Sequence, residues 1–181
     1  TKGETWQVRI SAADPYNATS EGSAQVTIAN SAPSCALAVL LPSSGTTDTV
    51  FTCSCPQRDD PDDDTPVDTC TFRDGDDDLI TVDADADGTC TLPPAEISRG
   101  MALSCAYTPG DGDDTGEPAL SGEVLVQNSL PSAPTVLLTP EEGLVDTLFT
   151  CAVDSEATDA DGDALVYQTV WVVNDFPNPG T

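Results

Sequence analysis

The sequence "DTVFTCSC" at residues 48–55 returns almost unchanged as "DTLFTCAV" at residues 146–153, a spacing of 98 residues. A second pair of segments has the same spacing, because "VTIAN" at residues 26–30 is matched by "VLVQN" at residues 124–128. Self-similarity at one fixed period is the sequence signature of a tandem repeat. The chain is therefore expected to contain successive copies of one structural unit.

The tripeptide Ser-Ala-Pro follows each "VTIAN"-type segment and has the composition of a linker. We therefore predict that residues 1–30 are the C-terminal strands of a first repeat and that residues 31–131 are a complete repeat with its linker. Residues 132–181 are then the N-terminal strands of a third repeat. Since the two end fragments together amount to one unit, we expect a longer array. The alternative is head-to-tail completion between subunits.

The fold class follows from the pattern inside the complete repeat. Short runs rich in β-branched residues alternate with clusters of Gly, Pro, Asp and Ser, and no segment has a sustained helical period. Such runs occupy residues 35–41, 48–55, 67–73, 79–83, 100–107 and 120–127. Six or so strands in about 98 residues are typical of an immunoglobulin-type β-sandwich. We predict an all-β chain of tandem immunoglobulin-like β-sandwich repeats.

Cysteine usage indicates the compartment. The chain has seven cysteines, no histidine and no Cys-x-x-Cys pair, which favours disulfides over zinc or redox sites. Disulfides persist outside the reducing cytosol, so we expect an extracellular or cell-surface protein. The chain begins at Thr1 rather than Met and has no visible export signal, so we expect a mature or excised piece.

One disulfide is predicted from strand pairing. A tight turn centred on Gly45 would place Cys35 opposite Cys55 on neighbouring strands. The third repeat has Val136 and Val153 at the equivalent positions, so both cysteines are lost together, as expected for partners.

The sandwich architecture suggests the other pairs. Cys53 lies in the second predicted strand and Cys105 in the next-to-last, the two positions that an immunoglobulin-like domain bridges between its sheets. Cys70 and Cys90 then remain for each other, although the sequence alone leaves other connectivities open. Cys151 is the odd cysteine, and we expect its partner beyond residue 181.

Two segments carry a resemblance to a known family. The run "TKGETWQVRISAADPYNATSEGSAQVTIANSAPS", residues 1–34, combines a Lys-Gly-acidic-Thr-Trp strand, a polar loop and a strand ending in Asn. The run "TDADGDALVYQTVWVVND", residues 158–175, combines an acidic loop with a strand that contains Trp. Both resemble the immunoglobulin-like and PKD-like tandem repeats of large secreted bacterial surface proteins. Val8 stands where that family commonly has the second bridging cysteine.

Charge excludes several classes of partner. The formal net charge is −27, from 32 acidic and five basic residues, so the surface repels nucleic acid and anionic lipid. We expect neither nucleic-acid binding nor membrane insertion of this segment. We also expect no enzymatic activity, because the carboxylates lie in loops without the aromatic lining that holds a sugar in a glycosidase.

Acidic loops are the strongest functional signal. Carboxylates at alternate positions of a turning loop can converge on one hard cation, and Ca²⁺ takes six to eight oxygen ligands. The candidate calcium ligands are Asp60, Asp62 and Asp64 in "DPDDD" and, 99 residues later, Asp159, Asp161 and Asp163 in "DADGD". A third run supplies Asp83, Asp85 and Asp87. The alternative is that these runs are solvated loops that keep the protein soluble.

These observations favour a non-catalytic structural or adhesive repeat module of a cell-surface protein, stalk or filament, stabilised by disulfides and calcium. Its expected partners are neighbouring repeats or subunits in the array, with surface glycans as further candidates. The alternative is a carbohydrate- or protein-binding accessory module of a secreted protein. Exposed aromatic residues would favour this alternative, whereas we predict that Trp6 and Trp171 are core residues, because both lie in β-branched runs.

Overall fold

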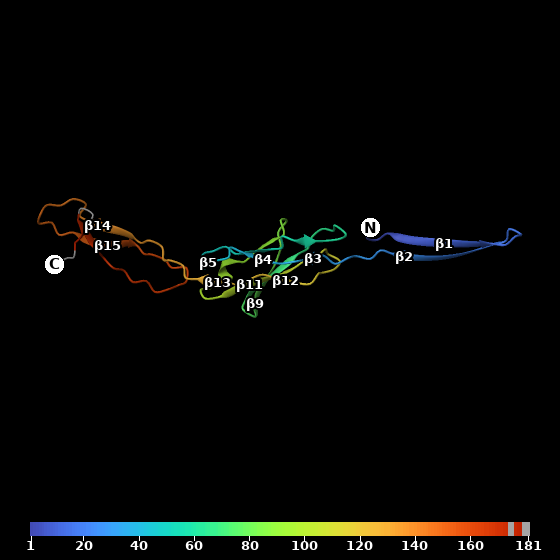
Figure 1. Cartoon of the computed structure of the whole chain (residues 1–181). Coiled ribbons are helices and arrows are strands. Elements are labelled where there is room, and N and C mark those ends of the chain that lie inside the picture. The colour runs from blue at the N-terminus through green and yellow to red at the C-terminus, as the bar shows by residue number, and fades with distance from the viewer. Residues whose placement is uncertain (174–175, 179–181) are drawn as a thin grey trace.

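The chain is built from β-strands. The computed structural model describes residues 1–173 and 176–178, and in this part the regular elements are strands apart from a 3₁₀ turn at Pro94–Glu96. A hairpin, a central unit and a C-terminal segment follow one another along the molecule (Figure 1). Residues 174–175 and 179–181 of the expected third repeat lie outside the described residues.

The N-terminal hairpin consists of β1 (Thr5–Ala13) and β2 (Thr19–Thr27), paired antiparallel along their whole length. Its turn is closed by Asp14, whose Oδ1 accepts hydrogen bonds from the backbone N–H groups two and four residues later. Every residue of both strands is exposed. The prediction that Trp6 is a core residue is not met within the described residues, where its side chain is 64% exposed and no second sheet packs on it.

Two larger sheets form the central unit. The smaller sheet has the order β10 (Thr89–Thr91), β6 (Thr52–Ser54), β4 (Val39–Leu41). The larger sheet has the order β5 (Gly45–Thr46), β13 (Val124–Gln127), β11 (Ala102–Thr108), β8 (Thr69–Asp74), β9 (Asp77–Asp83), with β12 (Ala119–Leu120) also on β11. A short ladder joins β3 (Ser34–Cys35) to β7 (Arg58–Asp59).

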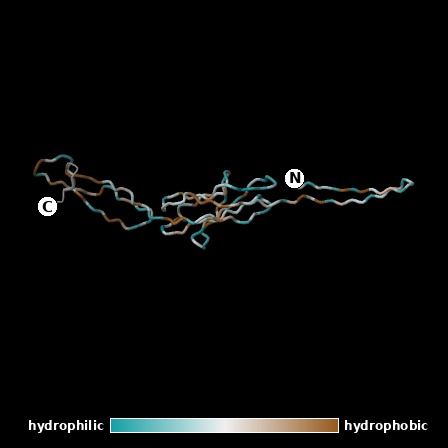
Figure 2. The backbone as a smooth tube through the Cα atoms, viewed as in Figure 1, coloured by the Kyte–Doolittle hydropathy of each residue, from teal (hydrophilic) through white to brown (hydrophobic). Residues whose placement is uncertain are grey.

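The core of the central unit follows from strand alternation. Successive side chains of a strand point to opposite faces, and along β11 every second residue is buried. Residues of both sheets pack into one apolar cluster: Leu40, Phe51, Cys53, Cys70, Phe72, Cys90, Leu103, Cys105, Tyr107, Val124 and Val126 are among its members. Apolar positions are frequent in the middle of the molecule and recur along its two outer parts (Figure 2).

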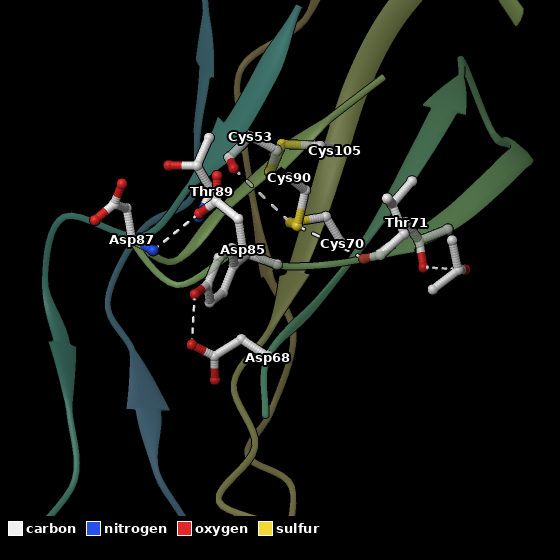
Figure 3. The surroundings of a disulfide bond; sticks show 12 residues. Cys53, Asp68, Cys70, Thr71, Asp85, Asp87, Thr89, Cys90 and Cys105 are labelled. Atoms are coloured by element: carbon white, nitrogen blue, oxygen red, sulfur yellow. Dashed lines mark hydrogen bonds between the residues drawn. A yellow bond between two sulfur atoms is a disulfide. The ribbon is translucent and has the colours of Figure 1, made fainter. Parts of the chain in front are cut away.

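Two disulfides cross between the sheets of the central unit. Cys53 on β6 is bonded to Cys105 on β11, and Cys70 on β8 to Cys90 on β10 (Figure 3). A third disulfide joins Cys35 to Cys55. These are the three pairs expected from the sequence. Cys151 is free and exposed.

The register of the β4–β6 pair differs from the prediction. Leu40 faces Cys53, and Cys35 faces Arg58 rather than Cys55. The reason is that Gly45 does not form a tight turn. It starts β5, which pairs in parallel with β13, so the connection between β4 and β6 is longer than a tight hairpin allows. Cys35 and Cys55 still meet, with their Cα atoms 6.1 Å apart.

The C-terminal segment contains two antiparallel ladders. β14 (Thr135–Thr139) pairs with β15 (Thr150–Ser155), and β16 (Trp171–Val173) pairs with β17 (Phe176–Asn178). Trp171 is 41% exposed, so the prediction that it is a core residue is also not met within the described residues. Its counterpart in the central unit, Phe72, is fully buried.

Strand registers recur at the period of the sequence. In the central unit Leu40 pairs with Cys53, and 98 residues later Leu138 pairs with Cys151. The contacts beside the closing strands recur as well. Gly3 N–H donates to Ile28 O at 2.9 Å, and Gly100 N–H donates to Val126 O at the same distance.

Despite these shared registers, side chains that are buried in the central unit are exposed at the equivalent positions of the outer parts. Leu103, the counterpart of Trp6, is completely buried because the small sheet covers β11. No such sheet lies on β1 within the described residues.

Candidate functional site

The first acidic loop lies against the end of the N-terminal hairpin. Asp62 Oδ2 accepts the backbone N–H of Ser31 at 2.7 Å. Lys2 Nζ donates to Asp64 Oδ2 at 2.7 Å and to Asp113 Oδ2 at 2.6 Å. We call this set of contacts the first junction, since it joins residues 1–31 to the central unit.

Asn30 completes the first junction. Its Nδ2 donates to Asp111 Oδ2 and to Asp114 Oδ2, both at 2.9 Å. Asp111 is 8% exposed, and its Oδ1 accepts the backbone N–H groups of Asp113 and Asp114. The backbone N–H of Asp114 and the Asn30 amide stabilise the ionised carboxylate and lower the pKa of Asp111 to about 2. Asp113 and Asp64 raise the pKa of Lys2 through the hydrogen bonds that they accept.

The second acidic loop makes equivalent contacts with the other end of the central unit. Asp161 Oδ2 accepts the backbone N–H of Ser129 at 2.6 Å, and Asp161 Oδ1 accepts the Thr47 hydroxyl at 2.8 Å. Both of Asp163's carboxylate oxygens accept hydrogen bonds from Arg99. We call these contacts the second junction.

The two junctions share one design. In each, the middle aspartate of the loop accepts the N–H of the serine that follows Asn30 or Asn128, and the third aspartate binds a cationic side chain. Lys2 and Arg99 stand 97 residues apart and each precedes a glycine. Sequence reasoning found the aspartates but missed these two cations, although the repeat spacing could have identified them.

Both loops are shaped by their first aspartate. Asp60 Oδ1 accepts the N–H of Asp62 at 3.0 Å, and Asp159 Oδ1 accepts the N–H of Asp161 at 2.9 Å. A side-chain oxygen that accepts the backbone N–H two residues later forms an Asx turn. Asp85 makes the same contact in the third run, so this turn alone does not distinguish a junction.

The structure brings together some of the predicted cation ligands. One carboxylate oxygen each from Asp159, Asp161 and Asp163 lies within 4.8 Å of the other two. At the first junction the corresponding group is Asp60, Asp64 and Asp111. Asp111 was missed because it is about 50 residues from its partners in the sequence.

The other predicted ligands are not gathered in this way. Asp62 is turned towards Ser31 and is not a member of the first group. Asp83, Asp85 and Asp87 form no such group within the described residues.

A buried ion pair between Arg58 and Asp68 lies next to the first junction. Asp68 is 4% exposed, and it accepts hydrogen bonds from Arg58 Nε at 3.0 and 3.2 Å and from the Tyr107 hydroxyl at 2.6 Å. The guanidinium also donates to Gly110 O at 2.8 Å. Burial and the bond to Asp68 raise the pKa of Tyr107. This network fixes Arg58 and Gly110 beside the acidic loops.

No family model, no curated protein and no solved structure matched the chain in comparisons with known proteins. In the described part of the chain, none of the helical segments has the length and apolar character needed to cross a bilayer. The three disulfides indicate an oxidising environment such as the extracellular space.

Replacing Asp161 with alanine is expected to loosen the second junction. The charge-assisted bond to Ser129 N–H is lost, and such bonds contribute about 1.5–3 kcal/mol, so exchange of the Ser129 amide hydrogen should accelerate tenfold or more. Hydrogen exchange resolved by NMR measures this directly. Asp146→Ala, which removes an exposed carboxylate of the same segment, is the matched control. An unchanged Ser129 rate in Asp161→Ala would contradict the role given to this contact.

Proposed function

We propose that this chain is a non-catalytic spacer: a tandem array of immunoglobulin-like β-sandwich repeats of about 98 residues in an extracellular or cell-surface stalk or filament. Residues 31–131 are the complete repeat with its linker. Residues 1–30 and 132–181 belong to the repeats before and after it. The neighbouring repeats are then the main partners of each unit.

The repetition of the junction carries this proposal. At both ends of the central unit, a linker serine and a cationic side chain are held by the second and third aspartates of an acidic loop. A repeat protein in which each unit contacts only its neighbours gains length with every unit added. Linkers whose backbone N–H groups are hydrogen-bonded to the next unit restrict swinging, which suits a spacer.

Within the complete repeat, the burial of the aromatic residues favours a spacer over a carbohydrate-binding module, whereas the exposed Trp6 and Trp171 lie in the end segments. All three aromatic residues of the complete repeat, Phe51, Phe72 and Tyr107, are at most 1% exposed. Sugar rings stack on exposed aromatic faces, and the central unit offers none. The stem of a surface structure needs no such platform.

Deletion of one repeat distinguishes the spacer function from the binding-module function. Removing residues 31–128 in frame joins Asn30 to Ser129 and so recreates the Asn-Ser sequence of both junctions. In cells that make the protein, we expect a surface structure that is shorter by one unit and still attaches normally. Electron microscopy of the cells and an attachment assay give the two readouts. Loss of attachment with unchanged length would instead support a binding module.

A further inference from the structure

We propose that the first junction is a calcium site, in which Asp60, Asp64 and Asp111 bind one Ca²⁺ and Asn30 of the linker closes the site from the preceding unit. The proposal that Ca²⁺ binds at this place depends only on residues of this chain. Its effect on the stiffness of an array rests on the function proposed above.

Unsatisfied oxygens point to a ligand at this place. Among the described residues, two buried side-chain polar atoms have no hydrogen-bond partner, and they are Asp60 Oδ2 and Asn30 Oδ1. Both belong to the first junction. The Asp60 side chain is 4% exposed, and its Oδ2 lies 3.7 Å from the Arg58 guanidinium, too far for a hydrogen bond. A buried oxygen without a donor destabilises the fold, more so when it is charged, and a bound ion removes that cost.

Two of the three carboxylates in the cluster keep an oxygen that is free to bind a cation. Asp60 Oδ1 accepts Asp62 N–H, and Lys2 is bonded to Asp64 through Oδ2. Each of these carboxylates therefore keeps an oxygen that makes no hydrogen bond in the described structure. Asp111 already holds the Asn30 amide through Oδ2, which places Asn30 beside the group.

The charge at the junction is strongly negative. Six carboxylates take part in its contacts: Asp60, Asp62, Asp64, Asp111, Asp113 and Asp114. Lys2 supplies one positive charge, and Arg58 is shared between Asp60, at 3.7 Å, and its closer, buried partner Asp68, at 3.0 Å. A divalent cation relieves the repulsion that remains among the carboxylates.

The donor set favours calcium. All the available ligand atoms are carboxylate or amide oxygens, which suit hard cations. Ca²⁺ accepts irregular sets of such oxygens, including Asn carbonyls, whereas Mg²⁺ requires a near-ideal octahedron and retains several waters. Since Asn30 lies in the linker and the aspartates lie in the central unit, one ion here would tie two successive units together.

The second junction lacks the unpartnered buried oxygens of the first. Its three carboxylates lie close together, but within the described residues none of its buried side-chain oxygens lacks a hydrogen-bond partner. The inference is therefore confined to the first junction.

Isothermal titration of the full chain with CaCl₂, after removal of metal with a chelator, tests the site. We expect saturable binding that Asp60→Asn weakens at least tenfold, in line with the 10- to 100-fold losses seen even for residues outside the ligand shell. Asp85→Asn is the matched control, because Asp85 forms the same turn but belongs to no cluster. Its affinity for calcium should equal that of the unaltered chain.

Amide chemical shifts locate the bound ion. A second variant keeps the test valid if Asp60→Asn fails to fold. Calcium should shift the amides of Asn30, Asp60 and Asp111, and Asn30→Ala, which leaves the aspartates in place, should also reduce affinity. Absence of saturable binding, equal affinity in Asp60→Asn, or equal binding of Mg²⁺ would each overturn the proposal. Because the titration needs only this chain, its failure leaves the spacer function untouched. Conversely, calcium binding without a surface array would refute the spacer alone.

Discussion

Replacing both Cys53 and Cys105 with alanine is expected to lower the free energy of unfolding of the central unit by about 4 kcal/mol. This disulfide joins the two sheets, both cysteines are completely buried, and they are 52 residues apart in the sequence. The cost arises because the unfolded chain regains the freedom that closing so long a loop removes. Urea denaturation followed by circular dichroism gives the value.

The matched comparison is the variant Cys35→Ala, Cys55→Ala. This disulfide spans only 20 residues and lies at the edge of the core, so the expected loss is roughly 3 kcal/mol. An equal or smaller loss in the Cys53, Cys105 variant would contradict the view that this inter-sheet disulfide stabilises the core more than the Cys35–Cys55 disulfide does.

Replacing Asp68 with alanine is expected to cost about 3–5 kcal/mol, because removing one partner of a buried pair leaves the other charge uncompensated. Arg58 is 17% exposed along its side chain and would lose its main carboxylate partner, and the Tyr107 hydroxyl would lose its acceptor. Thermal and urea unfolding measure the loss.

The exposed pair Arg73–Asp78 supplies the control for Asp68. The Asp78 side chain is 66% exposed, and exposed pairs contribute about 0–1 kcal/mol, so Asp78→Ala should change stability little. Similar losses of stability in Asp68→Ala and Asp78→Ala would show that the Arg58–Asp68–Tyr107 network stabilises the fold no more than an exposed ion pair does.

Much of the fold could be predicted because its signals are local. Alternation of apolar and polar residues has a period of two in any half-buried strand, and it indicated most strands of the central unit. β10 was missed, since "TCT" is too short to show alternation. The register of β4 and β6 was also missed, because turn arithmetic assumes a tight hairpin, whereas Gly45 takes part in a parallel ladder with β13.

The candidate site was predicted only in part because its contacts are long-range. The acidic positions are visible in the sequence, but the hydrogen bond from Lys2 to Asp113 joins residues that are 111 positions apart in the sequence. The burial of Asp68 is equally invisible, since the residue lies in the predicted strand 67–73 and nothing in that run shows that Arg58 and Tyr107 bond to it. Trp6 was placed in a core by its β-branched neighbours, yet burial requires a covering sheet that the local sequence does not report.

Cryo-electron microscopy of the native material tests the central claim, that equivalent junctions hold successive repeats in a fixed line. We predict a thin rod or stalk in which density recurs once per unit of about 98 residues, with a constant angle between neighbours. Isolated compact particles, or units joined at random angles, would contradict it.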